Sequence, residues 1–574
     1  MRLSDAQPLR PLWYHSPVQP VIFAQQMREI DRLTVENYHT TSLLLMESAS
    51  AACLEAIRAR FNGDFDGKRA LVLCGKGNNG GDGAALARGL CRASVQCDVV
   101  LFGRFAETRG DAHTNFESVR RLASFEAGSP EAPAPLTFIE CEGVSAWEQI
   151  AKPRRTYDVI VDALFGTGLT RPLEGVFLKV VEHLAMIRSA RERAGGVRPL
   201  VLSIDIPSGL NADKAEPIGP AVRADVTVTF TAPKPANVLP PASVFGGELI
   251  VADIGSPASL IAAAKPWLFL TEAEDVQRWL VSTRYQPESY KNTHGHVLLV
   301  AGSRGYSGAA ALSGNAAMRS GAGLVTIATP SSAQPLVATR AMPEVMTTAL
   351  AETDRGAVSD EAVDHFLSLA SKATVVAVGP GLTSDDERTR RFVRGIVERR
   401  LRPCVIDADG LNCLAPWPAE LSGSETQPLI LTPHPGEMLR LIGADSRSAL
   451  DDRISVARKF ATEHGLILVL KGSRPMVASP DGRVFINPTG NAGLGTAGSG
   501  DTLTGLISGF LAQAYGTLGK DADPVAGTIA ALYAGGLAGD LAARKLGMRT
   551  MVASDIREHF SEAIQLLDRE GEQP

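Results

Sequence analysis

The run Leu71-Val-Leu-Cys74 leads into the loop Gly75-Lys-Gly-Asn-Asn-Gly-Gly-Asp-Gly83, which in turn leads into Ala84-Ala-Leu-Ala-Arg88. The apolar run predicts a buried strand, and the segment after the loop predicts a helix. Glycines let a backbone turn tightly and approach a ligand, and the free N–H groups at a helix N-terminus attract phosphate. The loop has neither the usual G-x-G-x-x-G form nor a Walker sequence, so the pattern alone allows a ligand site or a structural turn.

The same order of apolar run, glycine-rich turn and helical pattern recurs along the chain. The runs are Ala70–Cys74, Asp158–Ala163, Pro199–Ile206 and Asp225–Phe230 in the first half, and Gly295–Ala301, Gly323–Ala328, Ala373–Val378, Cys404–Asp407, Leu429–Leu431 and Leu466–Leu470 in the second. They lack strict alternation, as is typical of parallel strands covered by helices on both faces. We therefore predict an α/β protein of two domains, with a boundary near residue 280.

Length and composition agree with this organisation. A chain of 574 residues exceeds the usual size of one domain, and 45% hydrophobic with 21% charged residues is ordinary for a globular protein. The net charge of −6 gives no basic surface for nucleic acids or anionic membranes. The seven cysteines form no C-x-x-C pair, which matches neither a disulfide framework nor a zinc site.

We also looked for segments that would carry the chain to or through a membrane. The N-terminal stretch Met1–Leu12 is interrupted by charged residues and prolines, so it does not resemble a signal peptide. The longest apolar run, Val525–Gly539, is shorter than the ~20 residues that a membrane span needs. We expect a cytoplasmic protein with no membrane or nucleic-acid partner.

Polar side chains follow three of the predicted strands in the first half. They are Asn78, Asn79 and Asp82, then Asp162 within the run Asp158–Gly168, then Asp205 and Ser208 within the run Ser203–Gly209. The carboxyl ends of strands in an open α/β sheet face one crevice, so these side chains could converge. Any one aspartate there could instead cap a helix or form a turn. Oxygen ligands from Asn79, Asp162 and Ser208 would suit a hard cation rather than zinc.

Together these motifs resemble the NAD(P)H-hydrate epimerase domain, a Rossmann-like α/β/α sandwich, over residues 20–255. Lys76 stands where that family usually has proline, at a position that is not a ligand. The resemblance implies that Asn79, Asp162 and Ser208 bind K⁺ and that Asp205 is catalytic. It implies substrate contacts for Asn78, Asn79, Gly80, Gly81, Asp82, Gly166, Thr167, Gly168, Leu169, Thr170, Arg171, Pro172 and Asp205.

In the second half, Gly498-Ser-Gly-Asp501 leads into the helical pattern Thr502–Ile507. A glycine-rich loop that opens a helix forms an anion cradle, and a carboxylate beside bound phosphate would be repelled unless it had a task. Asp501 is a natural base for a hydroxyl that attacks phosphorus. It could also be the N-cap of the helix, and the two roles are compatible.

Four further strand ends carry polar or glycine-rich turns. Lys471-Gly-Ser-Arg474 brings a cation and a bare backbone to the same edge, and Thr432-Pro-His-Pro-Gly-Glu437 holds a histidine between two prolines. The turns Gly379-Pro-Gly381 and Gly302–Ala309 complete the set. Taken alone, the histidine and both turns fit a structural role as well as a functional one.

This second set resembles the ribokinase-like fold, and within it the ADP-dependent NAD(P)H-hydrate dehydratases, over residues 283–570. The family usually reads Asn-Pro-Gly-Met where this chain has Asn491-Ala-Gly-Leu494. The resemblance implies that Lys471, Gly472, Ser473, Arg474, Pro475 and Gly500 bind the adenine nucleotide. It also implies that Ala309, Gly381, His434 and Asp501 contact the hydrate, with Asp501 catalytic.

The combined resemblance implies repair of hydrated NADH and NADPH (NADHX and NADPHX). The first domain would interconvert the R and S hydrates, and the second would dehydrate the S form with ADP and Mg²⁺, giving NAD(P)H, AMP and phosphate. We expect the chain to form a homo-oligomer. The alternative is a ribokinase-like small-molecule kinase fused to a nucleotide-binding scaffold module. The Thr432–Glu437 loop argues against the kinase, and the Asp162, Asp205 and Ser208 set argues against the scaffold.

Overall fold

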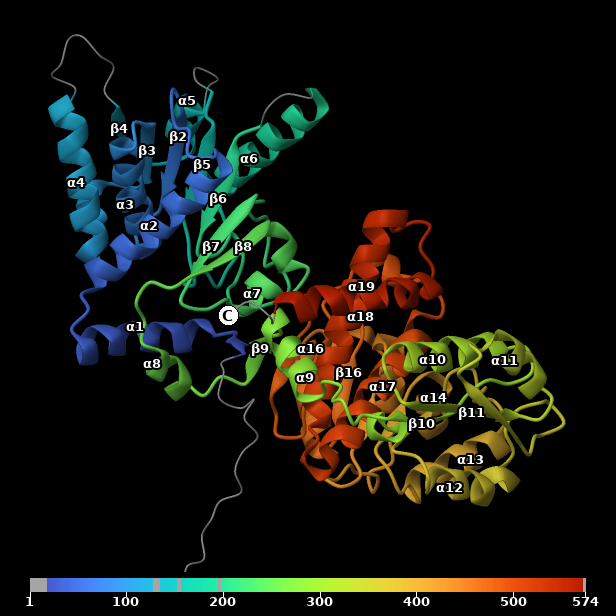
Figure 1. The fold of residues 1–574 in the computed structure, drawn as a ribbon. Helices are drawn as coiled ribbons and strands as arrows, with labels where there is room; N and C mark the ends of the chain where they lie inside the picture. Colours follow the sequence, from blue (N-terminus) through green and yellow to red (C-terminus); the bar gives the residue numbers. More distant parts are fainter. Residues whose placement is uncertain (1–17, 127–134, 152–155, 195–197, 571–574) are drawn as a thin grey trace, which may run out of the picture. The chain divides into compact units, whose positions relative to one another are not determined.

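The computed structural model describes residues 18–126, 135–151, 156–194 and 198–570. The chain divides into two compact units. The N-terminal unit is formed by Pro20–Pro266, and the C-terminal unit by Trp267–Pro574 together with the residues up to Gln19. Each unit is built around its own sheet, as the two series of apolar runs predict (Figure 1).

The N-terminal unit contains a seven-stranded sheet of order β4-β3-β2-β5-β6-β7-β8 in which every pair is parallel. The strands are β2 (Arg69–Cys74), β3 (Gln96–Phe102), β4 (Leu136–Cys141), β5 (Val159–Ala163), β6 (Leu200–Ile204), β7 (Val226–Phe230) and β8 (Glu248–Ala252). The helices are α1 (Ala24–Tyr38), α2 (Ser42–Arg60), α3 (Asn78–Arg92), α4 (Gly110–Glu126), α5 (Val144–Ile150), α6 (Gly175–Ala194), α7 (Pro235–Val238) and α8 (Ala258–Ala263).

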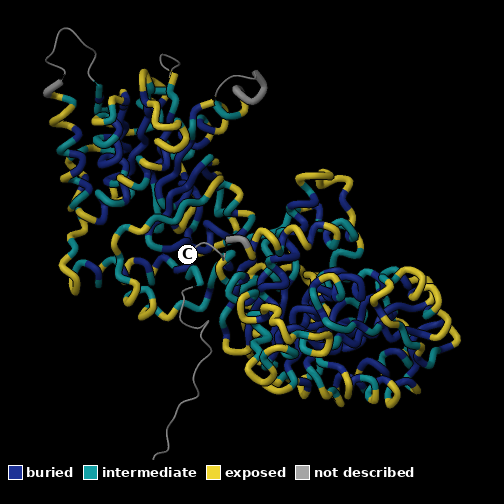
Figure 2. Tube along the Cα trace, in the orientation of Figure 1, coloured by how far each residue is buried: buried dark blue, intermediate teal, exposed yellow. Residues whose placement is uncertain are grey.

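Helices cover both faces of this sheet. On one face Cys53 of α2 and Leu86 of α3 pack against the strands, and on the other Trp147 of α5 and Val180 of α6 do so. Both faces are therefore buried, which explains the apolar runs without alternation (Figure 2). The prediction of an α/β sandwich is confirmed for this unit.

The C-terminal unit contains a mixed sheet of order β1-β9-β18-β17-β16-β15-β14-β13-β10-β11-β12. The strands are β1 (Gln19–Pro20), β9 (Leu268–Leu270), β10 (His296–Val300), β11 (Leu324–Pro330), β12 (Met346–Leu350), β13 (Val375–Val378), β14 (Cys404–Ile406), β15 (Leu429–Leu431), β16 (Ile467–Leu470), β17 (Met476–Ala478) and β18 (Val484–Ile486). The neighbouring strands in the part of the sheet ordered β16-β15-β14-β13-β10-β11-β12 are all parallel. The pairs β16-β17 and β17-β18 are antiparallel.

Eleven helices accompany this sheet within the described residues of the unit. They are α9 (Ala273–Ser282), α10 (Ser307–Arg319), α11 (Gln334–Arg340), α12 (Val363–Ala370), α13 (Glu387–Glu398), α14 (Ala408–Leu414), α15 (Pro435–Leu441), α16 (Arg453–Glu463), α17 (Ser499–Leu518), α18 (Pro524–Leu546) and α19 (Ala553–Glu570). Leu299 of β10, Phe510 of α17, Ala534 of α18 and Phe560 of α19 belong to one continuous core.

Helix α18 contains the apolar run that the sequence analysis judged too short to span a membrane. The helix is longer than the run, because Asp523 caps its start and it ends only before Gly547. Among the described residues it is the one helix that is long and apolar enough to cross a membrane. However, 61% of its most apolar window is buried, and it packs between α17 and α19, as a core helix does.

Residues 267–282 belong to the C-terminal unit. The predicted limits 20–255 and 283–570 leave this segment out, because it contains no long apolar run. In the structure β9 pairs with β18, and Trp279 of α9 stacks on Phe510 with ring centroids 4.2 Å apart. Val276 and Trp279 are both buried in the core of that unit. The chain divides at Pro266 and Trp267 rather than near residue 280.

A truncation series tests where the C-terminal unit begins. A chain that starts at Trp267 should fold, whereas one that starts at Thr283 should lose at least the ~3 kcal/mol typical of removing one large buried side chain, because Phe510 loses its stacking partner. Urea denaturation of both chains measures this difference. Trp279→Ala in the longer chain should account for much of it. Equal stability of the two truncated chains would contradict the assignment.

Candidate functional site

The loop after β2 is held in place by very close backbone contacts. A Cβ on Gly75 would lie 2.1 Å from the carbonyl oxygen of Leu164, and a Cβ on Gly80 would lie 1.8 Å from that of Gly75. No other residue type fits at these two positions. Helix α3 begins at Asn78, so the predicted loop Gly75–Gly83 is wrong in its second part: Asn78–Gly83, which includes Gly80, are helical. The free N–H groups of the first turn of α3 lie at the carboxyl end of β2.

A cavity of about 1060 Å³ opens at this edge of the N-terminal sheet. The predicted substrate residues that line it are Asn78, Asn79, Asp82, Gly166, Thr167, Gly168, Leu169, Arg171, Pro172 and Asp205. Gly80, Gly81 and Thr170 are not among the lining residues. Gly81 instead packs against α4, where a Cβ would lie 2.8 Å from the Cα of Ala112. The sequence analysis missed Asp31 and Lys234, which also line the cavity.

Lys234 is the buried cation of this cavity, with a side chain that is 1% exposed. Its Nζ donates to Asp205 Oδ1 at 2.7 Å, to Thr229 Oγ1 at 2.9 Å and to the carbonyl oxygen of Phe230 at 3.1 Å. Asp205 itself has a left-handed backbone, with φ of 64°, directly after β6. A lysine between Pro233 and Pro235 after an apolar strand is the signal that could have identified this residue.

The three predicted K⁺ ligands meet at the Phe165–Gly166 segment. Asp162 is fully buried and accepts from Ser203 Oγ and from the backbone N–H of Ser208, both at 2.8 Å. The Ser208 hydroxyl contacts the backbone N–H of Phe165 at 2.9 Å and its carbonyl oxygen at 3.3 Å. A Cβ on Gly166 would lie 3.1 Å from Asn79 Oδ1.

The donor chemistry of this segment suits an alkali cation. Burial raises the pKa of the Asp162 carboxyl, and its hydrogen bonds to Ser208 and Ser203 oppose that shift. The Nδ2 of Asn79 is buried without a hydrogen-bond partner in the described residues. Those residues include no cluster of three or more His, Cys, Asp or Glu side chains that could hold a metal. A cation here would therefore be held by amide, hydroxyl, carbonyl and single carboxylate oxygens.

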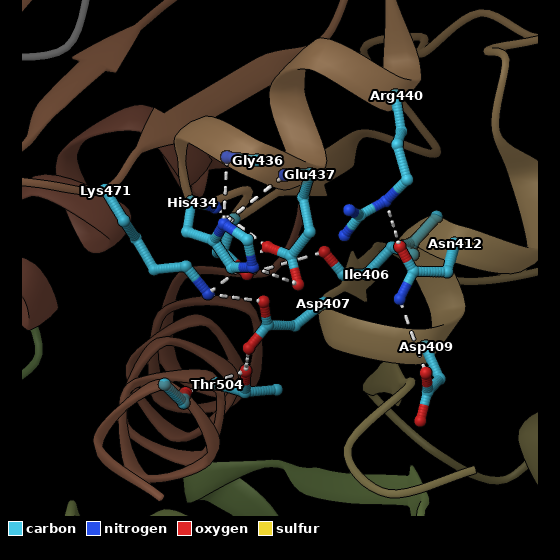
Figure 3. Close-up of polar contacts among 12 residues, drawn as sticks. Ile406, Asp407, Asp409, Asn412, His434, Gly436, Glu437, Arg440, Lys471 and Thr504 are labelled. Atoms are coloured by element: carbon cyan, nitrogen blue, oxygen red, sulfur yellow. Dashed lines mark hydrogen bonds and ion pairs between the residues drawn. The ribbon is translucent and has the colours of Figure 1, made fainter. Parts of the chain in front are cut away.

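The C-terminal unit has a second buried ion pair at the carboxyl ends of its strands (Figure 3). Asp407 follows β14 and is 1% exposed; its Oδ1 accepts from Lys471 Nζ at 2.7 Å and its Oδ2 accepts from Thr504 Oγ1 of α17 at 2.7 Å. Burial lowers the pKa of Lys471, but Asp407 and then Glu437 outweigh burial and leave it raised. The sequence analysis missed Asp407 and Thr504 as site residues, although Asp407 is the last residue of a predicted strand.

His434 begins α15 as its N-cap. Its Nδ1 accepts from the backbone N–H of Gly436 at 3.0 Å and of Glu437 at 3.3 Å, and the backbone N–H of His434 donates to Glu437 Oε2 at 2.8 Å. Burial and the neighbouring cations Lys471 and Arg440 lower the pKa of His434. These effects favour the neutral imidazole, whose Nε2 lies 3.4 Å from Glu437 Oε1, and about half of the side chain is exposed.

Asp501 lies in the first turn of α17 and is not its N-cap, so the alternative in the sequence analysis is wrong. The cap is Gly498, which adopts a left-handed conformation with φ of 86°. Burial, and next the charge of Asp407, raise the pKa of Asp501 to about 6, with Lys471 opposing them. A Cβ on Gly500 would lie 3.3 Å from Lys471 Nζ, so glycine keeps the space beside the ion pair open.

The remaining predicted residues lie in other strand-end loops of the C-terminal unit. A Cβ on Gly381, whose φ is 65°, would lie 3.0 Å from the Cβ of Ala309, so those two positions adjoin. In the Lys471–Pro475 loop Gly472 has a φ of 135°, and Arg474 Nη1 donates to the carbonyl oxygen of Pro488 at 2.8 Å. The sheet therefore carries a basic, glycine-rich loop beside a buried carboxyl group.

Known proteins match both halves of the chain. Residues 42–236 match the family model for the YjeF-related protein N-terminus, and residues 297–562 match the model for NAD(P)H-hydrate dehydratase. The bifunctional NAD(P)H-hydrate repair enzyme Nnr of Moorella thermoacetica is 38% identical over 96% of this chain and 98% of its own length. That of Escherichia coli is 31% identical over 93% of this chain and 92% of its own.

Among solved structures, the ADP/ATP-dependent NAD(P)H-hydrate dehydratase of Bacillus subtilis, co-crystallised with ATP and Mg²⁺, is 30% identical. It covers 52% of this chain and 97% of its own, with a TM-score of 0.43.

The two strand-end sites define a two-domain α/β enzyme that handles nucleotides. The matches along nearly the whole length then place this chain in the family of bifunctional NAD(P)H-hydrate repair enzymes. It combines an NAD(P)H-hydrate epimerase domain with an NAD(P)H-hydrate dehydratase domain. The sequence analysis is confirmed on the family and on both activities.

Removing the carboxylate of Asp407 tests the buried ion pair. Asp407→Asn leaves Lys471 without its nearest counter-charge, so the free energy of unfolding of the dehydratase domain should fall by about 3 kcal/mol. Asp385→Asn removes an exposed partner of Arg355 and should cost less than about 1 kcal/mol. Chemical denaturation measures both changes. An equal loss of unfolding free energy in the two variants would show that the buried pair stabilises the domain no more than an exposed pair does.

Proposed function

We propose that the dehydratase domain uses ADP as the phosphoryl donor and Asp501 as the base. The observation that carries this assignment is the position of Asp501: a largely buried carboxyl group in the first turn of α17, beside the Lys471–Asp407 ion pair. Asp501 accepts the proton of the substrate hydroxyl, and the β-phosphoryl group moves to that oxygen. Phosphate is a much better leaving group than hydroxide, so its C–O bond breaks as the adjacent ring carbon loses a proton to the surrounding water. This elimination restores the double bond and yields NAD(P)H, AMP and phosphate.

The nucleotide would lie along the loop Lys471–Pro475 and against Gly500. Lys471 neutralises developing charge, and the missing side chain at Gly500 lets the diphosphate approach the ion pair. Ala309, Gly381 and His434 would contact the hydrate. Mg²⁺ usually retains several waters and binds through phosphates with one or two carboxylates, and Glu437, which is 5% exposed, fits that need. When bound, the ion neutralises the diphosphate.

In the epimerase domain the cavity would hold the hydrated nicotinamide, and Asn79, Asp162 and Ser208 would hold K⁺. Both proposals rest on the cavity lining and on the oxygen donors around the Phe165–Gly166 segment. The substrates would be NADHX, NADPHX and ADP. We further propose that the enzyme works as a homo-oligomer in the cytoplasm, without nucleic-acid or membrane partners. The alternative of a kinase fused to a scaffold module is not supported, because both domains match hydrate-repair relatives.

The substitution Asp501→Asn tests the base. The amide keeps the shape of the side chain but cannot take up a proton, so dehydration of the S hydrate should fall by at least ~100-fold. Nucleotide binding should be retained or strengthened, since the carboxylate no longer repels the phosphates. The measurement is the absorbance of reduced nicotinamide with ADP, and separately with ATP, as the donor.

The pH profile adds a second readout. A base must be ionised, so wild-type activity should rise as the pH increases through about 6, the pKa of Asp501. The residual activity of the Asn variant should lack this limb. Asp445→Asn, at an exposed position of the same domain, should behave like wild type. Turnover of Asp501→Asn within a few fold of wild type would require another base.

The K⁺ proposal is tested by Asp162→Asn. The variant keeps acceptor oxygen but loses the negative charge, so stimulation of R-to-S conversion by K⁺ over Na⁺ should disappear while S-hydrate dehydration persists. Ser203→Ala is the matched control, because Ser203 also donates to Asp162 Oδ2 but is not a proposed ligand. It should retain the K⁺ response. Loss of both activities in Asp162→Asn would indicate misfolding instead.

A further inference from the structure

The epimerase cavity contains more carboxyl groups than its one buried cation, Lys234, can neutralise. The other cations in its lining, Arg28, Lys76 and Arg171, are exposed to solvent. Asp31 of α1, Asp82 of α3 and Asp205 after β6 all line it, together with Lys234. The three N–H donors of Lys234 are taken by Asp205, Thr229 and the carbonyl oxygen of Phe230. Lys234 therefore compensates Asp205 and has no donor left for the other two carboxyl groups.

Asp31 and Asp82 are left in an environment that disfavours a second and third negative charge. Asp31 Oδ1 is buried without a hydrogen-bond partner in the described part of the chain. Burial raises the pKa of Asp31 to about 6, with Lys234 opposing and Asp205 adding to the shift. Burial, and then the charges of Asp205 and Asp31, raise the pKa of Asp82 well above its ordinary value. A proton held on these groups near neutrality is available for transfer.

The chemistry of the hydrate requires such a proton. The reduced nicotinamide ring is an enamine. Its β-carbon takes up a proton, so water adds to the α-carbon, which is bonded to nitrogen. Inversion at that carbon breaks its C–O bond while the nitrogen lone pair forms C=N⁺. The oxygen leaves as water after gaining one proton. Water then adds to the opposite face and releases one proton, so atoms balance and no oxidant is needed.

We propose that Asp31 and Asp82 are the acid–base pair of this epimerisation. The pair delivers a proton to the departing hydroxyl and recovers one from the water that adds to the other face. Asp205, held by Lys234 at 2.7 Å, is the fixed anion that stabilises the cationic ring. This assignment rests on the proposed function, namely that the cavity binds the hydrate.

Two substitutions in the full-length chain test the pair. Asp31→Asn and Asp82→Asn should each lower the rate of R-to-S conversion, measured without nucleotide and above the spontaneous rate, by about 100-fold or more, with KM nearly unchanged. S-hydrate dehydration by the other domain should stay at the wild-type rate, as an internal control for folding. Asp66→Asn, at an exposed position of the same domain, is the matched control and should leave epimerisation unchanged.

Isotope exchange tests the C–O cleavage independently of any variant. In water enriched in ¹⁸O, wild-type enzyme should incorporate ¹⁸O into the hydrate at the rate of epimerisation, and both Asn variants should lose exchange and epimerisation together. Epimerisation without exchange, or variants within a few fold of wild type, would overturn the proposal. If wild type does not accelerate R-to-S conversion at all, the proposed function itself fails, which is a distinguishable result.

Discussion

Each domain of this protein rests on a buried lysine that faces an aspartate at the carboxyl end of a parallel strand. The pairs are Lys234 with Asp205 and Lys471 with Asp407, both at 2.7 Å. A charge can be kept in such a place only if it is paired and hydrogen-bonded, so hydroxyl and carbonyl groups of neighbouring elements must complete each pair. The positions of those elements follow from this demand: Thr504 ties α17 to the end of β14.

The same pairs determine which carboxyl groups can do chemistry. Once the lysine is paired with one aspartate, any further carboxyl group nearby is buried next to a negative charge and has no cation of its own. That is the situation of Asp501 beside Asp407 and of Asp31 beside Asp205, and in both cases the pKa rises to about 6. A general acid or base works best with a pKa near the ambient pH, so the ion pair that stabilises the fold also prepares its neighbour for proton transfer.

The sequence reveals the parts of this arrangement that are local. The strands β2, β5 and β6 and the glycine-rich turns after them can be predicted, because burial on both faces leaves continuous apolar runs. Strands β4 and β8 at the sheet edges are harder to predict, because Thr137 and Glu140 interrupt the apolar pattern of β4, and β8 offers only four apolar residues after Glu248, none of them fully buried. Contacts between distant segments leave no local pattern either. Asp407 and Thr504 are 97 residues apart, and nothing near either residue signals the other.

Backbone conformation is the other property that a motif conceals. In the sequence Gly498-Ser-Gly-Asp501 the aspartate looks like the helix N-cap. Only the structure, in which Gly498 is left-handed, shows that this glycine is the cap. The correction matters for the chemistry. A capping carboxylate would be engaged by backbone N–H groups that lower its pKa, whereas Asp501, displaced into the first turn, keeps a raised pKa. The glycine therefore fixes the helix start and at the same time leaves the carboxyl group with the raised pKa that its proposed role as a base requires.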